Sequence, residues 1–196
     1  FVPRVVEAFW REHRGVEVSV LDAPHTQVLE LVRSGAADLG LGTASGQRQD
    51  LATQVIGSDT FACVMPQGHP LAGTREVTWQ QLDGAPLIGS PAGDPLREQL
   101  DAALAREGIR LRRKLEVALP LTTLGMVRAG LGIAVLTTNV TPLASTLGLV
   151  TRKLTRPVVR REIALLWHAE RSLSPAAQQF RATLLAMKKG AASASG

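Results

Sequence analysis

The sequence has little of what most catalytic or metal-binding sites need. It contains one cysteine, Cys63, so no disulfide can form within the chain and nothing points to an oxidising compartment. The four histidines are scattered without metal-ligand spacing, so we expect neither a metal site nor a cofactor. Tyrosine is absent and aromatic residues make up only 4%, which argues against a surface that stacks nucleic-acid bases. No apolar run approaches the ~18 residues that a membrane span needs.

The composition is that of an ordinary globular protein with a basic surface. Hydrophobic residues make up 45% of the 196 residues, enough for one domain or for two small lobes with separate cores. The net charge is +5, and much of the excess lies in two runs. We interpret these runs as solvated strand edges; the alternative is attraction of an anionic ligand, or of DNA held by an attached module. The runs are Arg110, Arg112, Arg113 and Lys114, and Arg152, Lys153, Arg156, Arg160 and Arg161.

Hydrophobic periodicity at the start of the chain predicts a strand–helix–strand unit, whose two strands should be parallel with a right-handed crossover. Thr26 is the expected N-cap of the second helix, and Gly35 its end. A longer strand follows at about 55–65. A helix is expected over 2–13, and the unit that follows it comprises a strand over 16–20, a helix over 26–35 and a strand over 38–42.

A second set of strands and helices follows the turn residues near 66–73. The tail over 190–196 holds only Ala, Ser and Gly and should be disordered. The expected elements are a helical turn over 78–82, a strand over 86–89, a helix from Pro95 to Gly108, a strand over 115–118, a helix from Pro120 to Gly130, strands over 133–136, 149–154 and 162–168, and a last helix capped by Ser174.

Two motifs suggest chemistry that their context does not support. His69, in the stretch VMPQGHPLAG, follows an apolar strand and lies between Gly68 and Pro70, so we expect it to organise a turn rather than to catalyse. GLGIAVL at 130–136 resembles part of a dinucleotide-binding fingerprint. That fingerprint follows a strand and opens a helix, whereas here a helix precedes and a strand follows.

Four motifs in order resemble those of the effector-binding domain of LysR-type transcriptional regulators, a bacterial family. They cover nearly the whole chain, and each is weak alone. The motifs are LVRSGAADL at 31–39, GHPLA at 68–72, VRAGLGIA at 127–134, and SPAA at 174–177 with Phe180.

The resemblance implies an α/β fold like that of type 2 periplasmic binding proteins, with two Rossmann-like lobes joined by two crossover strands. Lobe I would hold 1–65 and 163–196, and lobe II would hold 68–160. The hinge crossings would lie at 66–67 and 161–162. The expected hinge residues are Val64, Met65, Pro66, Glu162 and Ile163.

The resemblance also implies a cytoplasmic sensor without enzymatic activity. A small effector would bind between the lobes and alter DNA binding and transcription by a longer protein. That protein would carry a further strand and a DNA-binding winged helix-turn-helix before this chain. Members pair as dimers of this domain and tetramers of the full protein. Val2, Val6 and Trp10 are the expected interface residues, although Trp10 could belong to the core instead.

Helix N-termini beyond the carboxyl ends of strands are the expected ligand-binding positions, because free amides meet there. Thr26 and Ser90 could instead satisfy helix ends, His25 could be a surface residue, and Leu119 and Pro120 could pack in the core. We expect Asp94 to cap the helix that follows it. The candidate effector-binding residues are His25, Thr26, Thr43, Ser90, Gly93, Leu119, Pro120, Leu121 and Thr122.

Two alternatives remain open at this point. The same fold could belong to a solute-binding protein of a transport system, or to an enzyme. An enzyme would need a nucleophile with a base in reach, and Cys63 lies in an apolar strand that suggests core packing. The effector cannot be named from the sequence; hydroxyl groups and helix N-termini favour a small carboxylate.

Overall fold

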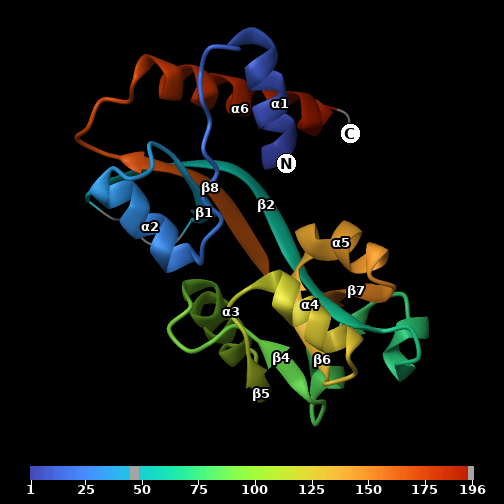
Figure 1. The fold of residues 1–196 in the computed structure, drawn as a ribbon. Coiled ribbons are helices and arrows are strands. Elements are labelled where there is room, and N and C mark those ends of the chain that lie inside the picture. The colour runs from blue at the N-terminus through green and yellow to red at the C-terminus, as the bar shows by residue number, and fades with distance from the viewer. Residues whose placement is uncertain (45–48, 194–196) are drawn as a thin grey trace. The chain divides into compact units, whose positions relative to one another are not determined.

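The computed structural model describes residues 1–44 and 49–193, with side chains up to Lys188. The chain divides into two compact units. Unit 1 holds Phe1–Gly57 and the chain from Glu162 onward, and unit 2 holds Ser58–Arg161. Strands β2 (Leu51–Pro66) and β8 (Arg160–His168) each have residues in both units (Figure 1).

Unit 2 is built on a mixed sheet in which β6 lies between β2 and β4, and β5 forms an edge. Strand β4 pairs in parallel with both β5 and β6, and β2 pairs antiparallel with β6 and β7. The short β3 pairs in parallel with β7. The elements are η1 (Pro70–Gly73), β3 (Val77–Thr78), η2 (Trp79–Leu82), β4 (Leu87–Gly89), α3 (Pro95–Ala105), β5 (Arg113–Glu116), α4 (Pro120–Arg128), β6 (Ile133–Thr137), η3 (Thr138–Val140), α5 (Thr141–Thr146) and β7 (Leu149–Thr155).

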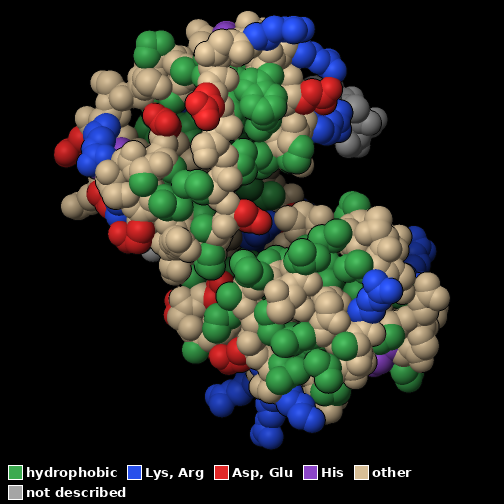
Figure 2. Space-filling model, in the orientation of Figure 1, with side chains coloured by type: hydrophobic (Ala, Val, Ile, Leu, Met, Phe, Trp, Pro, Cys, Tyr) green, Lys and Arg blue, Asp and Glu red, His purple; other side chains and the backbone are tan. Residues whose placement is uncertain are grey.

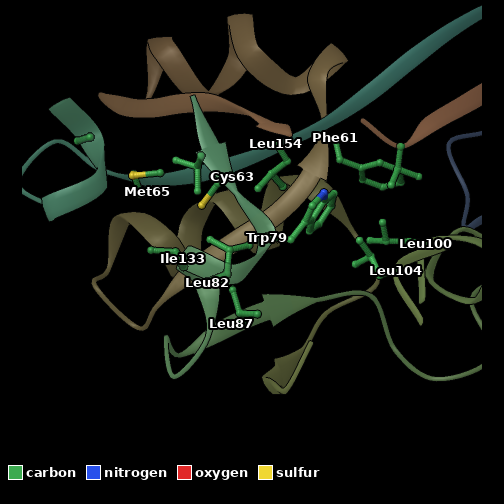
Figure 3. Packing of buried hydrophobic residues seen from close by; sticks show 13 residues of the cluster. Phe61, Cys63, Met65, Trp79, Leu82, Leu87, Leu100, Leu104, Ile133 and Leu154 are labelled. Atoms are coloured by element: carbon green, nitrogen blue, oxygen red, sulfur yellow. The ribbon is translucent and has the colours of Figure 1, made fainter. Parts of the chain in front are cut away.

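Alternation along the strands gives unit 2 a core on each face of its sheet. Successive residues of one strand enter different clusters: Cys63 belongs to one and Val64 to the other. The first cluster packs Leu100 and Leu104 of α3 against the sheet (Figure 3). The second packs α4 and α5 on the opposite face. Both faces are covered, which explains why the run from Phe61 to Met65 is apolar without interruption.

Unit 1 pairs β1 (Gly40–Thr43) antiparallel with β8 and covers them with α1 (Val2–Glu12), α2 (His25–Ser34) and α6 (Pro175–Ser193). Phe9 of α1 meets Phe180 of α6 edge-on, with ring centroids 5.2 Å apart. Leu165 lies in the same cluster as Val5 and Leu184, whereas Ala164 and Leu166 pack with α2. Alternation along β8 therefore serves two cores, as in unit 2.

The strand expected over 16–20 is not formed, so that prediction is wrong. Residues 16–20 have no regular secondary structure, and Val20 is 61% exposed. An alternating pattern makes a strand only where another strand supplies hydrogen bonds, and none of the described strands pairs with it. The expected parallel unit is consequently absent, and β1 pairs with β8 instead.

The first crossing between the units lies earlier than expected. It falls between Gly57 and Ser58 rather than at 66–67. Val64, Met65 and Pro66 pair with β7 within unit 2, and the first two are fully buried; a hinge role for these residues stays a prediction. Strand β2 extends well before its continuously buried run from Phe61 to Met65. The turn residues near 66–73 indicate only where the strand ends, not where it begins.

The second boundary between the units falls between Arg161 and Glu162; that a hinge crossing lies at 161–162 stays a prediction. Glu162 is the first residue of the returning segment, and its carbonyl accepts from the amide of Ala44 at 2.9 Å. Ile163 pairs with Thr43.

The helices differ from expectation in three places, two at a helix end and one where a whole helix was not predicted. Helix α2 begins at His25 with Pro24 as its N-cap, so Thr26 is not the cap. Helix α5 is missed, because its six residues are too few to show a helical period. Helix α6 continues to Ser193, so the tail expected to be disordered is helical at 190–193; residues 194–196 lie outside the described residues.

Candidate functional site

A cavity of about 170 Å³ lies in unit 2 beyond the carboxyl ends of β4, β5 and β6. Because these strands are parallel, the segments that follow them meet at one edge of the sheet. Ser90 follows β4, Pro120 follows β5, and Asn139 follows β6; all line the cavity. Phe61 and Leu100 supply apolar wall.

The first turn of α4 offers unsatisfied amides near this cavity. Pro120 occupies the first helical position, and the helix has no side-chain cap. Thr123 is buried and lines the cavity, and its hydroxyl donates to the carbonyl of Leu119 at 3.1 Å. The amides of Leu121 and Thr122 belong to the turn that has no intrahelical acceptor. An anion near this turn would be stabilised by them and by the helix dipole.

The first turn of α3, in contrast, is already occupied. The carboxylate of Asp94 accepts from the amides of Leu96 at 2.8 Å and Arg97 at 3.0 Å, as expected for a cap. Gly93 has a φ of +80°, which a glycine adopts without strain, and it does not line the cavity. A ligand carboxylate would be repelled here by Asp94.

The predicted ligand residues of unit 2 therefore separate into two groups. Ser90 and Pro120 line the cavity. Gly93, Leu119, Leu121 and Thr122 do not line it, and Leu121 is 62% exposed.

Among the described residues, the arginines of the cavity each have a carboxylate partner. Arg97 donates to the Ser90 carbonyl at 2.9 Å and to Glu116 at 2.5 Å. The bond to Glu116 raises the pKa of Arg97, and the same bond lowers the pKa of the Glu116 carboxyl. This part of the wall is close to electrically neutral.

The side chain of Arg113 passes over Gly89 of β4 and reaches Asp101 of α3. Its guanidinium donates to both oxygens of Asp101, at 2.9 and 2.6 Å, and only 7% of its side chain is exposed. A Cβ on Gly89 would lie 2.8 Å from Nε of Arg113, so the glycine leaves room for this side chain. The sequence interpretation placed Arg113 on a solvated edge. Its neighbours Arg112, just before the edge strand β5, and Lys114, on β5, are exposed. Figure 2 shows several Lys and Arg side chains gathered at the lower end of the view.

Arg161 and Asp59 form an ion pair that the sequence interpretation missed. Nε of Arg161 donates to Oδ1 of Asp59 at 2.8 Å, and Nη2 donates to Oδ2. The side chains are 15% and 9% exposed, and Arg161 lines the cavity. The two residues are 102 positions apart, so no local pattern could have revealed the pair.

The predicted ligand residues of unit 1 lie at the start of α2 and the end of β1. A Cβ on Gly42 would lie 2.5 Å from Nδ1 of His25, so the imidazole packs directly over β1. Thr43 is 4% exposed, whereas Thr26 is exposed on the first turn of α2. His25 and Thr43 therefore belong to one corner of unit 1.

The remaining candidate for chemistry, His69, is a cap. Its Nδ1 accepts from the amide of Leu71 at 3.2 Å at the start of η1, which agrees with the expected turn role. In the described part of the chain, no three His, Cys, Asp or Glu residues are placed to hold a metal ion. No described helix is long and apolar enough to cross a membrane.

An α/β architecture with a cavity at the carboxyl ends of parallel strands is that of a ligand-binding domain. The pattern that defines the LysR substrate-binding domain matches residues 1–189. The chain therefore belongs to the LysR effector-binding domains, and its fold is of the type 2 periplasmic-binding-protein class, as the motifs indicated. This family comprises regulators rather than enzymes, and the match decides against a transport protein.

Curated relatives agree with this assignment. The chain is 34% identical over 177 residues to the HTH-type transcriptional regulator YfeR of Shigella flexneri, covering 90% of this chain and 57% of the relative. It is 29% identical over 185 residues to the regulatory protein NocR of Agrobacterium tumefaciens, covering 94% and 61%. The chain thus spans about 60% of the length of these relatives.

Solved structures share the fold. The effector-binding domain of QuiR in complex with shikimate has a TM-score of 0.87 at 19% identity, covering 96% of this chain and 90% of that one. The CcmR regulatory domain of Synechocystis with 2-PG has a TM-score of 0.84 at 23% identity, covering 96% and 91%. The BenM effector-binding domain with benzoate has 0.79 at 16%, covering 97% and 87%.

Proposed function

We propose that this chain senses a small organic anion in the unit 2 cavity and that occupation of the cavity changes how a longer regulator acts on DNA. The main observation that supports this proposal is the position of the cavity. It lies beyond the carboxyl ends of β4, β5 and β6 and beside α4, whose first turn lacks a side-chain cap. The Ser90 hydroxyl lines the cavity and can donate to a carboxylate, and the dipole of α4, whose first residue Pro120 also lines the cavity, favours an anion there.

The size of the cavity favours a small metabolite. Its volume of about 170 Å³ is below the roughly 300–1,000 Å³ typical of pockets for drug-sized ligands. Shikimate and benzoate, bound by similar domains, are small carboxylic acids, which supports the same class of ligand here. That His25, Thr26 and Thr43 also contact the effector stays a prediction.

The proposed response follows from differential binding. An effector shifts a regulator only if it binds one arrangement of the protein better than another. The DNA-binding part would lie in the segment that the longer relatives have and this chain does not span, and the protein would act in the bacterial cytoplasm.

Self-association is part of the proposal. Val5 and Phe9 of α1 face the core, which leaves another side of the helix for a second copy. Trp10 is 46% exposed, so it is not a core residue; its Nε1 donates to the Val16 carbonyl at 3.2 Å. Val2 and Val6, on the same side as Trp10, are half-buried.

A thermal-shift screen of small metabolites tests the proposal. We expect carboxylates to raise the Tm, and their neutral amides to have no effect. The Ser90→Ala variant should reduce the shift, whereas Ser145→Ala, at an exposed serine of the same unit, should not. Stabilisation only by neutral or cationic compounds would show that the ligand is not an anion. Stabilisation by none would contradict effector binding.

A further inference from the structure

Arg161 differs from the other arginines of the cavity in where it comes from. Arg97 and Arg113 pair with carboxylates of α3 and β5, elements of the unit 2 sheet and its covering helix. Arg161 is the last residue of unit 2 on β8, and its partner Asp59 is the second residue of unit 2 on β2. The pair therefore joins the two strands that connect the units, at the point where both enter unit 2.

The geometry of the pair leaves part of the guanidinium for another anion. Asp59 accepts one bond from Nε and one from Nη2. A guanidinium carries five N–H groups, so the two on Nη1 and the second on Nη2 are not used by Asp59. These form the end of the fork, which can donate two parallel bonds to a second carboxylate.

The neighbouring wall supplies a further donor. The hydroxyl of Thr137 donates to Oδ1 of Asn139 at 2.6 Å, and both residues line the cavity with Arg161. This bond fixes the orientation of the amide, so that its Nδ2 hydrogens are turned away from Thr137. Thr137 is 6% exposed and therefore holds Asn139 from a buried position.

We infer that Arg161 binds the carboxylate of the effector, and that Asp59 is a positioning residue that holds the guanidinium for it. This inference rests on the proposed function and adds the residue that recognises the anion. A carboxylate on the free end of Arg161 uses the N–H groups that Asp59 leaves unused, so one guanidinium holds both acceptors. Occupation of the cavity therefore adds a bound group to the pair that joins β2 and β8 where both enter unit 2, which connects the effector directly to both strands.

Isothermal titration calorimetry with benzoate, shikimate and neutral benzamide tests binding. Arg161→Gln should raise the Kd for a carboxylate at least about tenfold, the change expected when a charged hydrogen bond of ~1.5–3 kcal/mol is lost. Arg160→Gln is the matched control, because Arg160 is the exposed neighbour with the same charge; it should leave the Kd unchanged. Asp59→Asn should weaken binding in the wild type but have no further effect in the Arg161→Gln background.

NMR of the Arg161 Nε–H signal with formate, the smallest carboxylate, keeps the test independent of ligand shape. We expect the signal to shift with formate and not with formamide. No shift, or equal Kd values for wild type and Arg161→Gln, would overturn the inference. An effector that stabilises both proteins equally would leave the proposed function intact while removing Arg161 from it, so the two failures are distinguishable.

Discussion

Arg113 and Asp101 form a two-bond ion pair in which the arginine is almost wholly buried and the aspartate is 39% exposed. The charge of Arg113 therefore depends on a carboxylate that water partly reaches. Removal of that carboxylate would leave the buried guanidinium of Arg113 without its two-bond ion-pair partner.

Replacing Asp101 with Ala should lower the free energy of unfolding by about 1–3 kcal/mol, because a buried charged donor is left without its partner. Chemical denaturation measures this change. Glu98→Ala is the control, since Glu98 is exposed on the same helix and should change stability by less than ~0.5 kcal/mol. Equal effects of the two substitutions would contradict the importance of the pair.

Two glycines of unit 2 should respond to alanine in opposite directions. A Cβ on Gly132 would lie 2.0 Å from the carbonyl oxygen of Pro86, and its φ is +156°, so Gly132→Ala should greatly reduce the yield of folded protein. A Cβ on Gly125, inside α4, would meet nothing within 4 Å. Gly125→Ala should therefore stabilise by about 0.5–1 kcal/mol. Thermal unfolding measures both changes, and a stable Gly132→Ala protein would show the close approach to be wrong.

Cys63 should be unreactive in the folded protein. It is fully buried, and burial raises the pKa of its thiol to about 12. The thiol ionises near its ordinary pKa of ~8.5 only in the unfolded chain, so its contribution to stability is present below that pH and is lost as pH rises toward the folded pKa. A thiol reagent should label the protein only after denaturant is added. Rapid labelling at neutral pH without denaturant would contradict the burial.

The Arg97–Glu116 bond should weaken in acid. The hydrogen bond from Arg97 lowers the pKa of the Glu116 carboxyl, so the favourable interaction is present above the ordinary carboxyl pKa and is lost as pH falls through the lowered value. An NMR titration of the Glu116 side chain should show ionisation at lower pH than the ordinary value for a glutamate. Arg97→Gln should return the Glu116 pKa toward its ordinary value. An unchanged titration in that variant would contradict the assignment.

The parts of the site that local signals describe were predictable. Asp94 followed by Pro95 marks a helix start, and the structure places the cap there. Ser90 and Pro120 follow strands that the pattern located, so their meeting beside the cavity follows from parallel pairing. These features depend on a few consecutive residues and the geometry of one sheet.

The parts that depend on distant partners were not predictable from local patterns. Asp59 and Arg161 meet only because β2 and β8 both enter unit 2 at the same place. The alternation of Val16 to Val20 is that of a strand, but a strand requires a partner that local sequence does not reveal. In the sequence, Val64 and Met65 stand at the end of an apolar run and therefore suggest a connection between lobes. In the structure both are buried and form strand pairs with β7.

The burial of β2 on both faces limits how the first connection can move. Shifting Cys63 and Val64 by one position would exchange their sides and place each in a cluster shaped for the other. The strand therefore cannot slide along its neighbours by a single residue. At Gly57 and Ser58, where β2 passes from one unit to the other, a Cβ on the glycine would meet nothing within 4 Å and the serine is exposed. Within unit 2, two cores on opposite faces of the sheet therefore hold β2 in a single register.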